Sequence, residues 1–332
     1  KMGFSIIELA ERYSGREAID ILLTVAKTVD WLQDVRFTIG KTGIGDTIAR
    51  VTPEQGGDII TAMGNFAIHK LGEPATKTGA SRVVQEPYHY FCLEKEIGIP
   101  VDVLDACPDD QRTRFIESEI NNQATFLTMM LANLMIYGVE GDNGYLFKGF
   151  ASDSAYETTD GDFVVDAGGS STEVYDAWLI CWGDNGCSLA VPNSIPGGIE
   201  VTYRDIHRVP IYETTAGGET IEKYQYQHIW QLGITFAPIV GIPGSIVRIC
   251  NIDPYGTSGG KLKKSLIHQA KAKLQNYIGN LQLLTSHEAL EELFEDISLT
   301  PTLVSPTTSD LGIPVDTYAG VRLRKCSALG LV

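Results

Sequence analysis

Two stretches of the chain carry apolar residues at the three- and four-residue spacing of an amphipathic helix. The first spans residues 17–33, and it is preceded by Ser5 and Glu8 in a capping-box pattern that predicts a shorter helix. The apolar positions of this first stretch are Ile19, Leu22, Leu23, Ala26, Val29 and Leu32. A helix with such a stripe needs a surface to lie on, so we interpret this segment as an arm attached to a larger body.

The second stretch, residues 109–137, is the strongest helix prediction in the sequence. It contains neither glycine nor proline, Pro108 suits a first turn, Asp109 and Asp110 complement the helix dipole, and Gly138 marks the end. One stripe is formed by Ile116, Ile120, Ala124, Leu127, Leu131 and Leu134. The second half is apolar all round, through Phe126, Met129, Met130, Met135 and Ile136. We therefore expect that half to be packed on more than one side.

Residues 36–84 lie between these helices and are rich in glycine and threonine but poor in apolar periodicity. A segment of this length without a core of its own is uncommon in a compact domain. The pattern favours a long hairpin or an extended loop, with residues 82–96 as the returning strand. Its backbone would find partners in another subunit.

The remainder of the chain reads as a run of strands followed by two helices and a last strand, a pattern typical of an α+β fold. Strands are expected at residues 177–182, 199–203, 206–212, 221–235 and 246–252. Helices are expected at residues 261–280 and 287–296, followed by a proline- and threonine-rich loop at 300–316 and a last strand at 321–323.

The order of these elements resembles the major capsid proteins of tailed double-stranded-DNA bacteriophages, which have the HK97-like fold. The likeness covers most of the chain, and it depends on the order and spacing of several segments rather than on one strict signature. These segments are residues 4–10, 137–142, 147–149, 164–169, 177–183, 247–253 and 318–326.

The resemblance implies a division of the chain into four parts. Residues 1–34 would be the N-terminal arm, and residues 35–100 the extended loop (E-loop) with its flanking strands. Residues 101–252 would form the peripheral domain, with the spine helix at 109–137. Residues 253–332 would form the axial domain and the C-terminal strand, although the family's usual axial segment is longer than the one present here.

The resemblance also implies a structural function without enzymatic activity or a cofactor. The chain would self-assemble into hexamers and pentamers of an icosahedral shell that encloses phage double-stranded DNA without sequence-specific binding. Its expected partners are further copies of itself, a scaffolding protein, a portal and a decoration protein. Its expected location is the virion, after synthesis in the cytoplasm of a bacterial host. An encapsulin-like nanocompartment shell is the alternative within the same fold.

Composition agrees with a folded protein that does not read a nucleic-acid duplex. The 332 residues are 43% hydrophobic, and 26 basic against 42 acidic residues give a net charge of −16. A negative lining would leave packaged DNA mobile. Six cysteines without a C-x-x-C pair are too sparse for a disulfide scaffold, which favours reduced thiols. Polar residues interrupt the uncharged stretch at 120–139, and prolines and glycines interrupt the one at 224–247, so we expect no membrane span.

One basic segment departs from this acidic balance. Residues 259–286 contain no Asp or Glu, and three of the lysines lie where the helix at 261–280 would begin, where the helix dipole disfavours cations. We therefore consider these lysines candidates for contact with acidic groups of an adjacent subunit or a scaffolding protein. The alternative is a solvated helix face. The five lysines are Lys261, Lys263, Lys264, Lys271 and Lys273.

The sequence also contains fragments of catalytic and binding motifs. Residues 256–260 match G-x-S-x-G, which would make Ser258 the nucleophile of a serine hydrolase. The acid that must lie between the serine and its histidine is missing before His287, the last histidine, so a flexible loop is favoured over this alternative. The fragment Gly40-Lys41-Thr42 lacks the first glycine of a phosphate-binding loop.

Metal ligation and acid–base chemistry have equally incomplete patterns. The pair His89 and Cys92 and the pair Cys181 and Cys187 lack further ligands at zinc spacing. The paired carboxylates have no histidine or calcium-loop pattern beside them, and solvated faces are favoured. These pairs are Asp109 and Asp110, Asp160 and Asp162, and Glu291 and Glu292.

Overall fold

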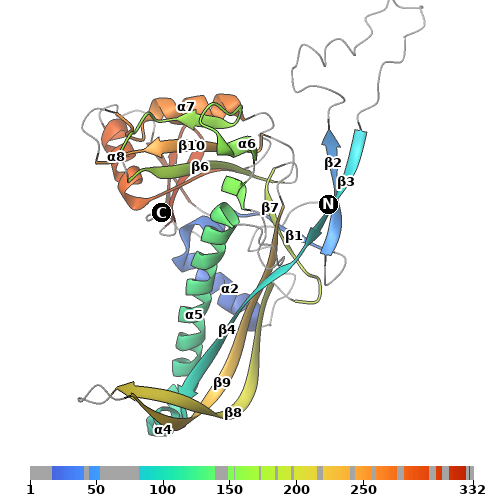
Figure 1. Cartoon of the computed structure of the whole chain (residues 1–332), viewed down its shortest axis with the longest axis vertical. Helices are drawn as coiled ribbons and strands as arrows, with labels where there is room; N and C mark the ends of the chain where they lie inside the picture. Colours follow the sequence, from blue (N-terminus) through green and yellow to red (C-terminus); the bar gives the residue numbers. More distant parts are fainter. Residues whose placement is uncertain are drawn as a thin grey trace, which may run out of the picture.

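The computed structural model describes an elongated body with a rounded lobe at one end and a two-stranded hairpin beside it (Figure 1). The described residues are 17–40, 45–52, 82–138, 149–152, 154–171, 173–183, 186–195, 198–214, 220–239, 244–255, 259–274, 280–298, 304–308, 314–326 and 329. The predicted capping box at Ser5 and Glu8 lies outside these residues.

The lobe is built on a seven-stranded sheet in the order β12-β13-β14-β11-β6-β10-β5. The strands are β5 (Val164–Asp166), β6 (Tyr175–Trp182), β10 (Ile246–Ile252), β11 (Asn280–Thr285), β12 (Val304–Thr308), β13 (Pro314–Tyr318) and β14 (Val321–Lys325). Helices α7 (Lys264–Lys273) and α8 (His287–Ser298) complete the lobe, and short helices η2 (Phe150–Ser152) and α6 (Ser154–Glu157) lie at its border with the body.

The two faces of this sheet belong to different cores, because side chains alternate along each strand. In β6, Leu179 and Cys181 pack in one cluster with residues of α7 and α8. Trp178, Ile180 and Trp182 point to the opposite face and pack in a second cluster with residues of the body. The sheet is therefore the middle layer between the helices of the lobe and the helices of the body.

The spine of the body is α5 (Asp109–Tyr137), whose bounds confirm the predicted helix. Its buried residues are Ile120, Ala124, Leu127, Thr128, Leu131, Ala132, Met135 and Ile136. Phe126 is 56% exposed and Met130 is 41% exposed. The expectation that the second half is packed on more than one side is therefore wrong for these two side chains within a single chain.

The body pairs α5 with a five-stranded sheet centred on β9 (Thr220–Ile239). Strand β4 (Phe91–Pro100) flanks β9 on one side, β8 (Ile199–Thr214) and β7 (Ser188–Val191) pair with it as well, and β1 (Phe37–Ile39) pairs with β7. Helix α2 (Glu17–Thr28) lies against α5 and β8, and α4 (Val101–Ala106) precedes α5 at the far end of the body.

The hairpin beside the body consists of β2 (Gly45–Thr52) and β3 (Arg82–His89), paired antiparallel along their full length. The sequence predicts one strand over 82–96, whereas the structure divides it at Tyr90 into β3 and β4. The middle of the expected extended loop, residues 53–81, lies outside the described residues.

Three predicted elements differ from the structure. The helix predicted for 17–33 ends at Thr28, where Val29 turns extended before the 3-10 helix η1 (Asp30–Asp34). The helix predicted for 261–280 ends at Lys273, and residues 280–285 instead form β11 inside the sheet. The loop predicted for 300–316 contains β12 and the start of β13. Strand β11 pairs with β6 and β14, which are distant in sequence, whereas β12 pairs with its neighbour β13 in a local hairpin.

Two further differences concern organisation. The strands predicted at 199–203 and 206–212 are one strand, β8, with an irregularity between Tyr203 and Asp205. The lobe sheet also crosses the domain boundary expected at residue 252, because β6 pairs with both β10 and β11. Among the described helices, none is long and apolar enough to cross a membrane.

Candidate functional site

The most heavily charged buried cluster of the described chain lies where the N-terminal segment meets the lobe. The side chain of Asp34, in η1, is fully buried. Its carboxylate accepts hydrogen bonds from Arg324 Nε at 2.7 Å, from Gln282 Nε2 at 3.1 Å and from Arg322. A buried carboxylate is tolerated when guanidinium groups and hydrogen bonds compensate its lost hydration, as they do here.

The amide of Gln282 extends this cluster across the sheet. Gln282 Nε2 also donates to the backbone oxygen of Trp31 at 2.8 Å, and Trp182 Nε1 donates to Gln282 Oε1 at 2.5 Å. The network thus joins η1 to β6, β11 and β14. Sequence analysis missed it; the available signal was the alternation of Arg322 and Arg324 with apolar Val321 and Leu323 in the last strand.

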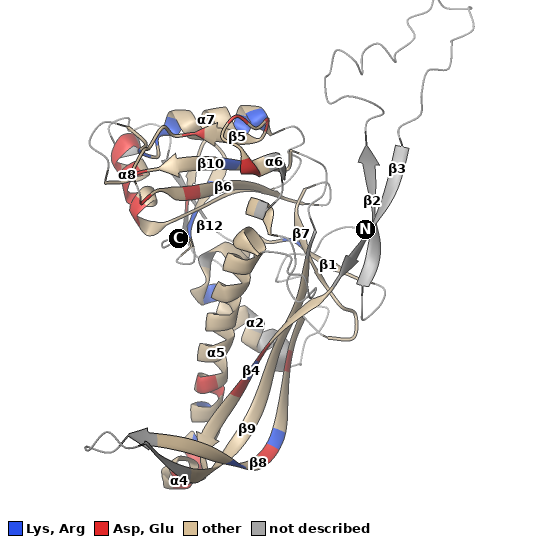
Figure 2. Ribbon diagram, viewed as in Figure 1, with Lys and Arg blue, Asp and Glu red and all other residues tan. Residues whose placement is uncertain are grey.

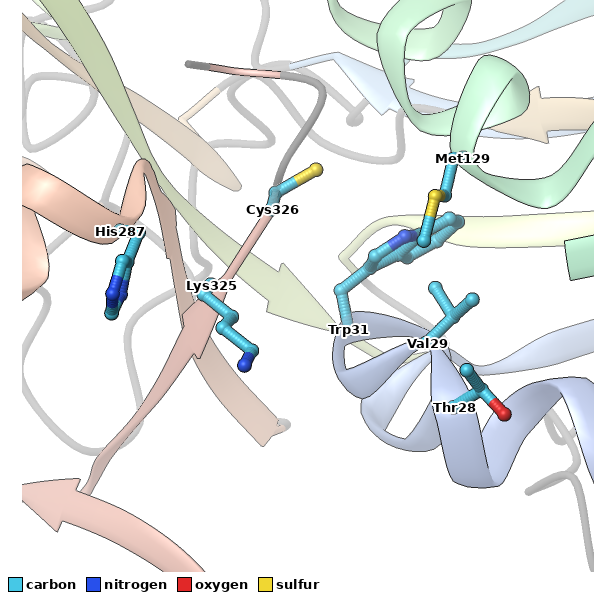
Figure 3. A pocket seen from close by; sticks show the side chains of 7 residues that line it. All are labelled: Thr28, Val29, Trp31, Met129, His287, Lys325 and Cys326. Atoms are coloured by element: carbon cyan, nitrogen blue, oxygen red, sulfur yellow. The ribbon is translucent and has the colours of Figure 1, made fainter. Parts of the chain in front are cut away.

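A small cavity of about 100 Å³ lies beside this network, between the N-terminal segment, α5 and the lobe. Figure 3 shows Trp31 and Met129 on one side of the cavity, and His287, Lys325 and Cys326 on the other. The volume corresponds to about three waters at roughly 30 Å³ each. His287 Nε2 lies 3.2 Å from Glu291 Oε1, and both side chains are exposed on the surface of α8. The cavity is a packing gap at a junction rather than a binding site of the usual size.

A larger groove, of about 500 Å³, opens between α2, α5 and the β8–β9 hairpin. It is lined by Ile21, Thr24, Thr113, Ile116, Glu117, Ile120, Asn121, Val201, Tyr203 and Trp230. At its edge, Tyr203 Oη lies 2.8 Å from His228 Nδ1, and the Tyr203 and Trp230 rings are 5.1 Å apart. Glu117 is the charged member of this lining, and Thr24, Thr113 and Asn121 are also polar, so the groove is a mixed polar and apolar surface with two aromatic rings at its edge.

The five candidate lysines do not act as one patch. Lys261 Nζ pairs with Glu292 Oε1 of α8 at 2.6 Å, and this hydrogen bond raises the pKa of Lys261. Lys271 Nζ donates to the backbone oxygen of Ala319 at 2.6 Å, and Lys273 Nζ donates to that of Val164 at 2.6 Å. Three of the five therefore have partners within their own chain.

The basic first turn of α7 also has an acidic partner within the same chain. Lys264 N donates to Asp296 Oδ2 of α8 at 2.9 Å, so an acidic side chain from another helix caps the first turn. Figure 2 shows basic residues on α7 and acidic residues on the neighbouring α8. Lys263 differs, because it is exposed and its side chain has no partner among the residues that the structure describes. The intersubunit role of the lysines stays a prediction, and Lys263 is now its main candidate.

The described cysteines form no disulfide bonds with one another, and their environments differ. Burial raises the pKa of Cys181 and of Cys250 to about 11, so both thiols are protonated and unreactive at neutral pH. Cys92 is exposed, although partial burial and the charges of Glu94 and Glu200 raise its pKa as well.

Maleimide labelling of the native chain at neutral pH should modify Cys92 first and leave Cys181 and Cys250 unmodified. Labelling of Cys92 should accelerate as pH rises, because a raised pKa shifts thiolate formation to higher pH. Peptide mass spectrometry identifies the labelled sites, and a denatured sample, in which all six cysteines react, is the control. Rapid labelling of Cys181 in the folded chain would contradict the burial described here.

The motif fragments gain no support from the structure. Ser258, Lys41 and Thr42 lie outside the described residues, so neither a hydrolase centre nor a phosphate loop can be placed. Within the described part of the chain, no group of three or more His, Cys, Asp or Glu side chains is arranged to hold a metal ion.

A long spine helix against a sheet of long strands, a separate sheet-containing lobe and a side hairpin define the class: a capsid-shell protein of the HK97-like fold. Residues 70–331 match the family model described as Major capsid protein GP7. The chain belongs to this family, and it is a structural protein of a viral shell. This confirms the family, fold class and structural role expected from the sequence.

Several solved structures are similar to this chain at low sequence identity. The chain is 14% identical to a protein of bacteriophage Epsilon15, with a TM-score of 0.54 over 90% of this chain and 86% of that chain. A capsid chain of bacteriophage JBD30 is 9% identical, with a TM-score of 0.46 over 90% of each chain. An encapsulin from Synechococcus elongatus PCC 7942 is 9% identical, with a TM-score of 0.40 over 66% of this chain and 85% of that chain. A comparison with curated proteins found no match.

Proposed function

We propose that this chain forms the hexamers and pentamers of an icosahedral phage capsid that encloses double-stranded DNA. The family match over residues 70–331 carries this proposal. The chain would be made in the cytoplasm of a bacterial host and act in the virion without catalytic activity. Its net charge of −16 supports a shell that does not bind the genome tightly, because a phosphate backbone is bound by excess Lys and Arg.

We assign the capsid domains by packing rather than by position in the chain. The lobe, with its seven-stranded sheet, α7 and α8, would be the axial domain, and it includes β5, β6 and β10. The spine α5 and the sheet of β4, β8 and β9 would be the peripheral domain. The β2–β3 hairpin would be the base of the extended loop. A scaffolding protein, a portal and a decoration protein would be the further partners.

Electron microscopy of the purified full-length chain tests the proposal. Closed shells built from hexamers and pentamers are the expected result, and shells from phage-infected cells should contain DNA. Shells loaded with a protein cargo instead of DNA would favour the encapsulin-like nanocompartment. A chain that stays monomeric under all assembly conditions would refute both.

Charge reversal of Lys263 tests the remaining lysine hypothesis. Lys263→Glu should lower the yield of shells while the subunit stays folded, because the side chain is exposed and would meet an acidic group of a neighbour or a scaffolding protein. Particle yield by sedimentation and folding by circular dichroism are the measurements. Lys271→Glu is the comparison variant, because this substitution also removes the hydrogen bond from the Lys271 ammonium group to the backbone oxygen of Ala319 in the same chain. Normal shells from the Lys263 variant would leave a solvated face as the explanation.

A further inference from the structure

The β8–β9 hairpin exposes more large apolar side chains than any other element of the described chain. Ten such side chains are exposed among the described residues, and six of them lie on this hairpin. The six are Tyr203, Ile206, Ile211, Tyr212, Tyr224 and Tyr226. Tyr212 is 68% exposed and Tyr226 is 59% exposed.

Five of these six side chains share one face of the hairpin, because directly paired residues lie on the same side of a sheet. Tyr203 is opposite Trp230, Ile206 is opposite His228, and Arg208 is opposite Tyr226. The bulge at Asp205, where φ is 95°, adds one residue and so keeps Tyr203 and Ile206 on the same side. Ile211 points to the opposite side. We call the surface of Tyr203, Ile206, Arg208, Tyr212, Tyr224 and Tyr226 the hairpin face.

The hairpin face continues the core face of the sheet. Further along the same side, Ile199, Leu232 and Ile234 are almost fully buried in the cluster that also contains α5 and α2 residues. The helices cover that part and leave the distal part open. Isolated soluble chains rarely expose a contiguous apolar surface of this kind, and such surfaces mark binding sites.

Two side chains of the hairpin face already contact each other. The guanidinium of Arg208 lies 3.7 Å from the centre of the Tyr224 ring, which fixes both groups by a cation–π contact. Prior order lowers the entropic cost of binding, and Tyr and Arg are the residue types that dominate interface energies. The four tyrosines together expose on the order of 450 Å², if each ring residue can bury about 200 Å². That is about half of the roughly 800 Å² that a stable interface buries per partner.

We propose that the hairpin face binds the acidic corner of a neighbouring copy of this chain. The acidic corner is formed by α4 and the first turn of α5, where Asp102, Asp105, Asp109 and Asp110 are exposed beside Val103, which is 45% exposed. Arg112 pairs with Asp105 and Asp109 and leaves an excess of negative charge. Arg208 supplies the opposite charge, and Val103 supplies an apolar contact.

The positions of the two surfaces favour a copy of the chain as the occupant. Hairpin and acidic corner lie at the same end of the body, away from the lobe (Figure 1). Copies related by rotation about an axis at this end would place the hairpin of each chain on the corner of the next. Such a head-to-tail contact closes into a ring. The inference rests on the proposed function, because it names the partner surface used in assembly.

A charge swap in the full-length chain tests this contact. Arg208→Glu should abolish shells while circular dichroism stays unchanged. Combining it with Asp102→Lys or with Asp109→Lys should restore shells in at least one of the two double variants. Lys325→Glu, an exposed charge reversal in the lobe, is the matched control and should assemble normally. If Arg208→Glu fails to fold, Tyr226→Ser replaces it as the single variant, with the same loss of shells expected.

The outcomes separate this inference from the proposed function. Shells from the wild type and from Arg208→Glu alike would overturn the inference, leave the proposed function standing and point to a different partner for the hairpin face. Loss of shells without rescue by either double variant would overturn the acidic corner as the partner surface. A wild-type chain that forms no shells would overturn both.

Discussion

Replacing Asp34 with alanine should lower the free energy of unfolding by about 3–5 kcal/mol, the cost of breaking a buried ion pair from one side. The substitution leaves Arg324, which is 4% exposed, without its counter-charge. It also removes one acceptor of Gln282, whose amide joins η1 to the sheet. Urea denaturation of the unassembled subunit, followed by tryptophan fluorescence, measures the change.

The control for this prediction is Asp160→Ala, because Asp160 is exposed and its removal should change stability little. A second comparison replaces Asp34 and Arg324 together with leucine and methionine. The double variant should lose less than Asp34→Ala, because the buried charge of Arg324 is removed together with its partner, and the remaining arginine, Arg322, is partly exposed. An alanine variant as stable as the wild type would show that the network contributes nothing to holding the N-terminal segment.

Removing residues 53–81 and joining β2 to β3 by a short glycine-containing turn should abolish closed shells. The sequence of this segment cannot form a core, and we propose that it crosses a neighbouring subunit. Body and lobe should remain folded, because their cores use residues outside the deletion. Electron microscopy reports shell closure, and thermal denaturation reports the fold.

This deletion starts after β2 and ends before β3. It keeps Gly40, whose backbone nitrogen donates to Val191 at 2.9 Å, and it keeps the β2–β3 pairing. A matched control replaces residues 53–81 with a glycine- and serine-rich linker of equal length, which should also fail to close shells. Normal shells from the deleted chain would refute the proposed role of the extended loop.

The sequence alone predicted an element correctly where several local signals favour the same bounds. For α5, the absence of Gly and Pro, the acidic first turn and Gly138 at the end all favour the same bounds, and the structure has those bounds. The same holds for β10, whose mostly apolar segment from Ile246 to Ile252 is a strand of the predicted length. The family resemblance depended on this order of elements, and the family match confirms it.

Sequence was insufficient where distant segments decide the structure. No strand is predicted at 280–285, but Leu281 and Leu283 face one core while Gln282 and Leu284 face the other, as a central strand requires. The carboxylate of Asp34 meets arginines nearly 300 residues later, and no local pattern in η1 indicates this. The lysines at 261–273 likewise appeared unpaired, because their partners lie in α8, on β5 and after β13.

The position of β14 determines when the lobe can be completed during synthesis. This strand pairs with β11 on one side and β13 on the other, and it is formed by residues 321–325, near the end of the described chain. A nascent chain that has not yet been translated as far as residue 321 lacks strand β14. It also lacks Arg322 and Arg324, the arginines that hold η1. The β11–β14 pairing and the contacts of the arginines with η1 join residues far apart in sequence, and contacts of this kind slow folding. Each copy therefore gains its finished lobe only after translation has passed these residues, so incomplete chains cannot enter a growing particle in the native form.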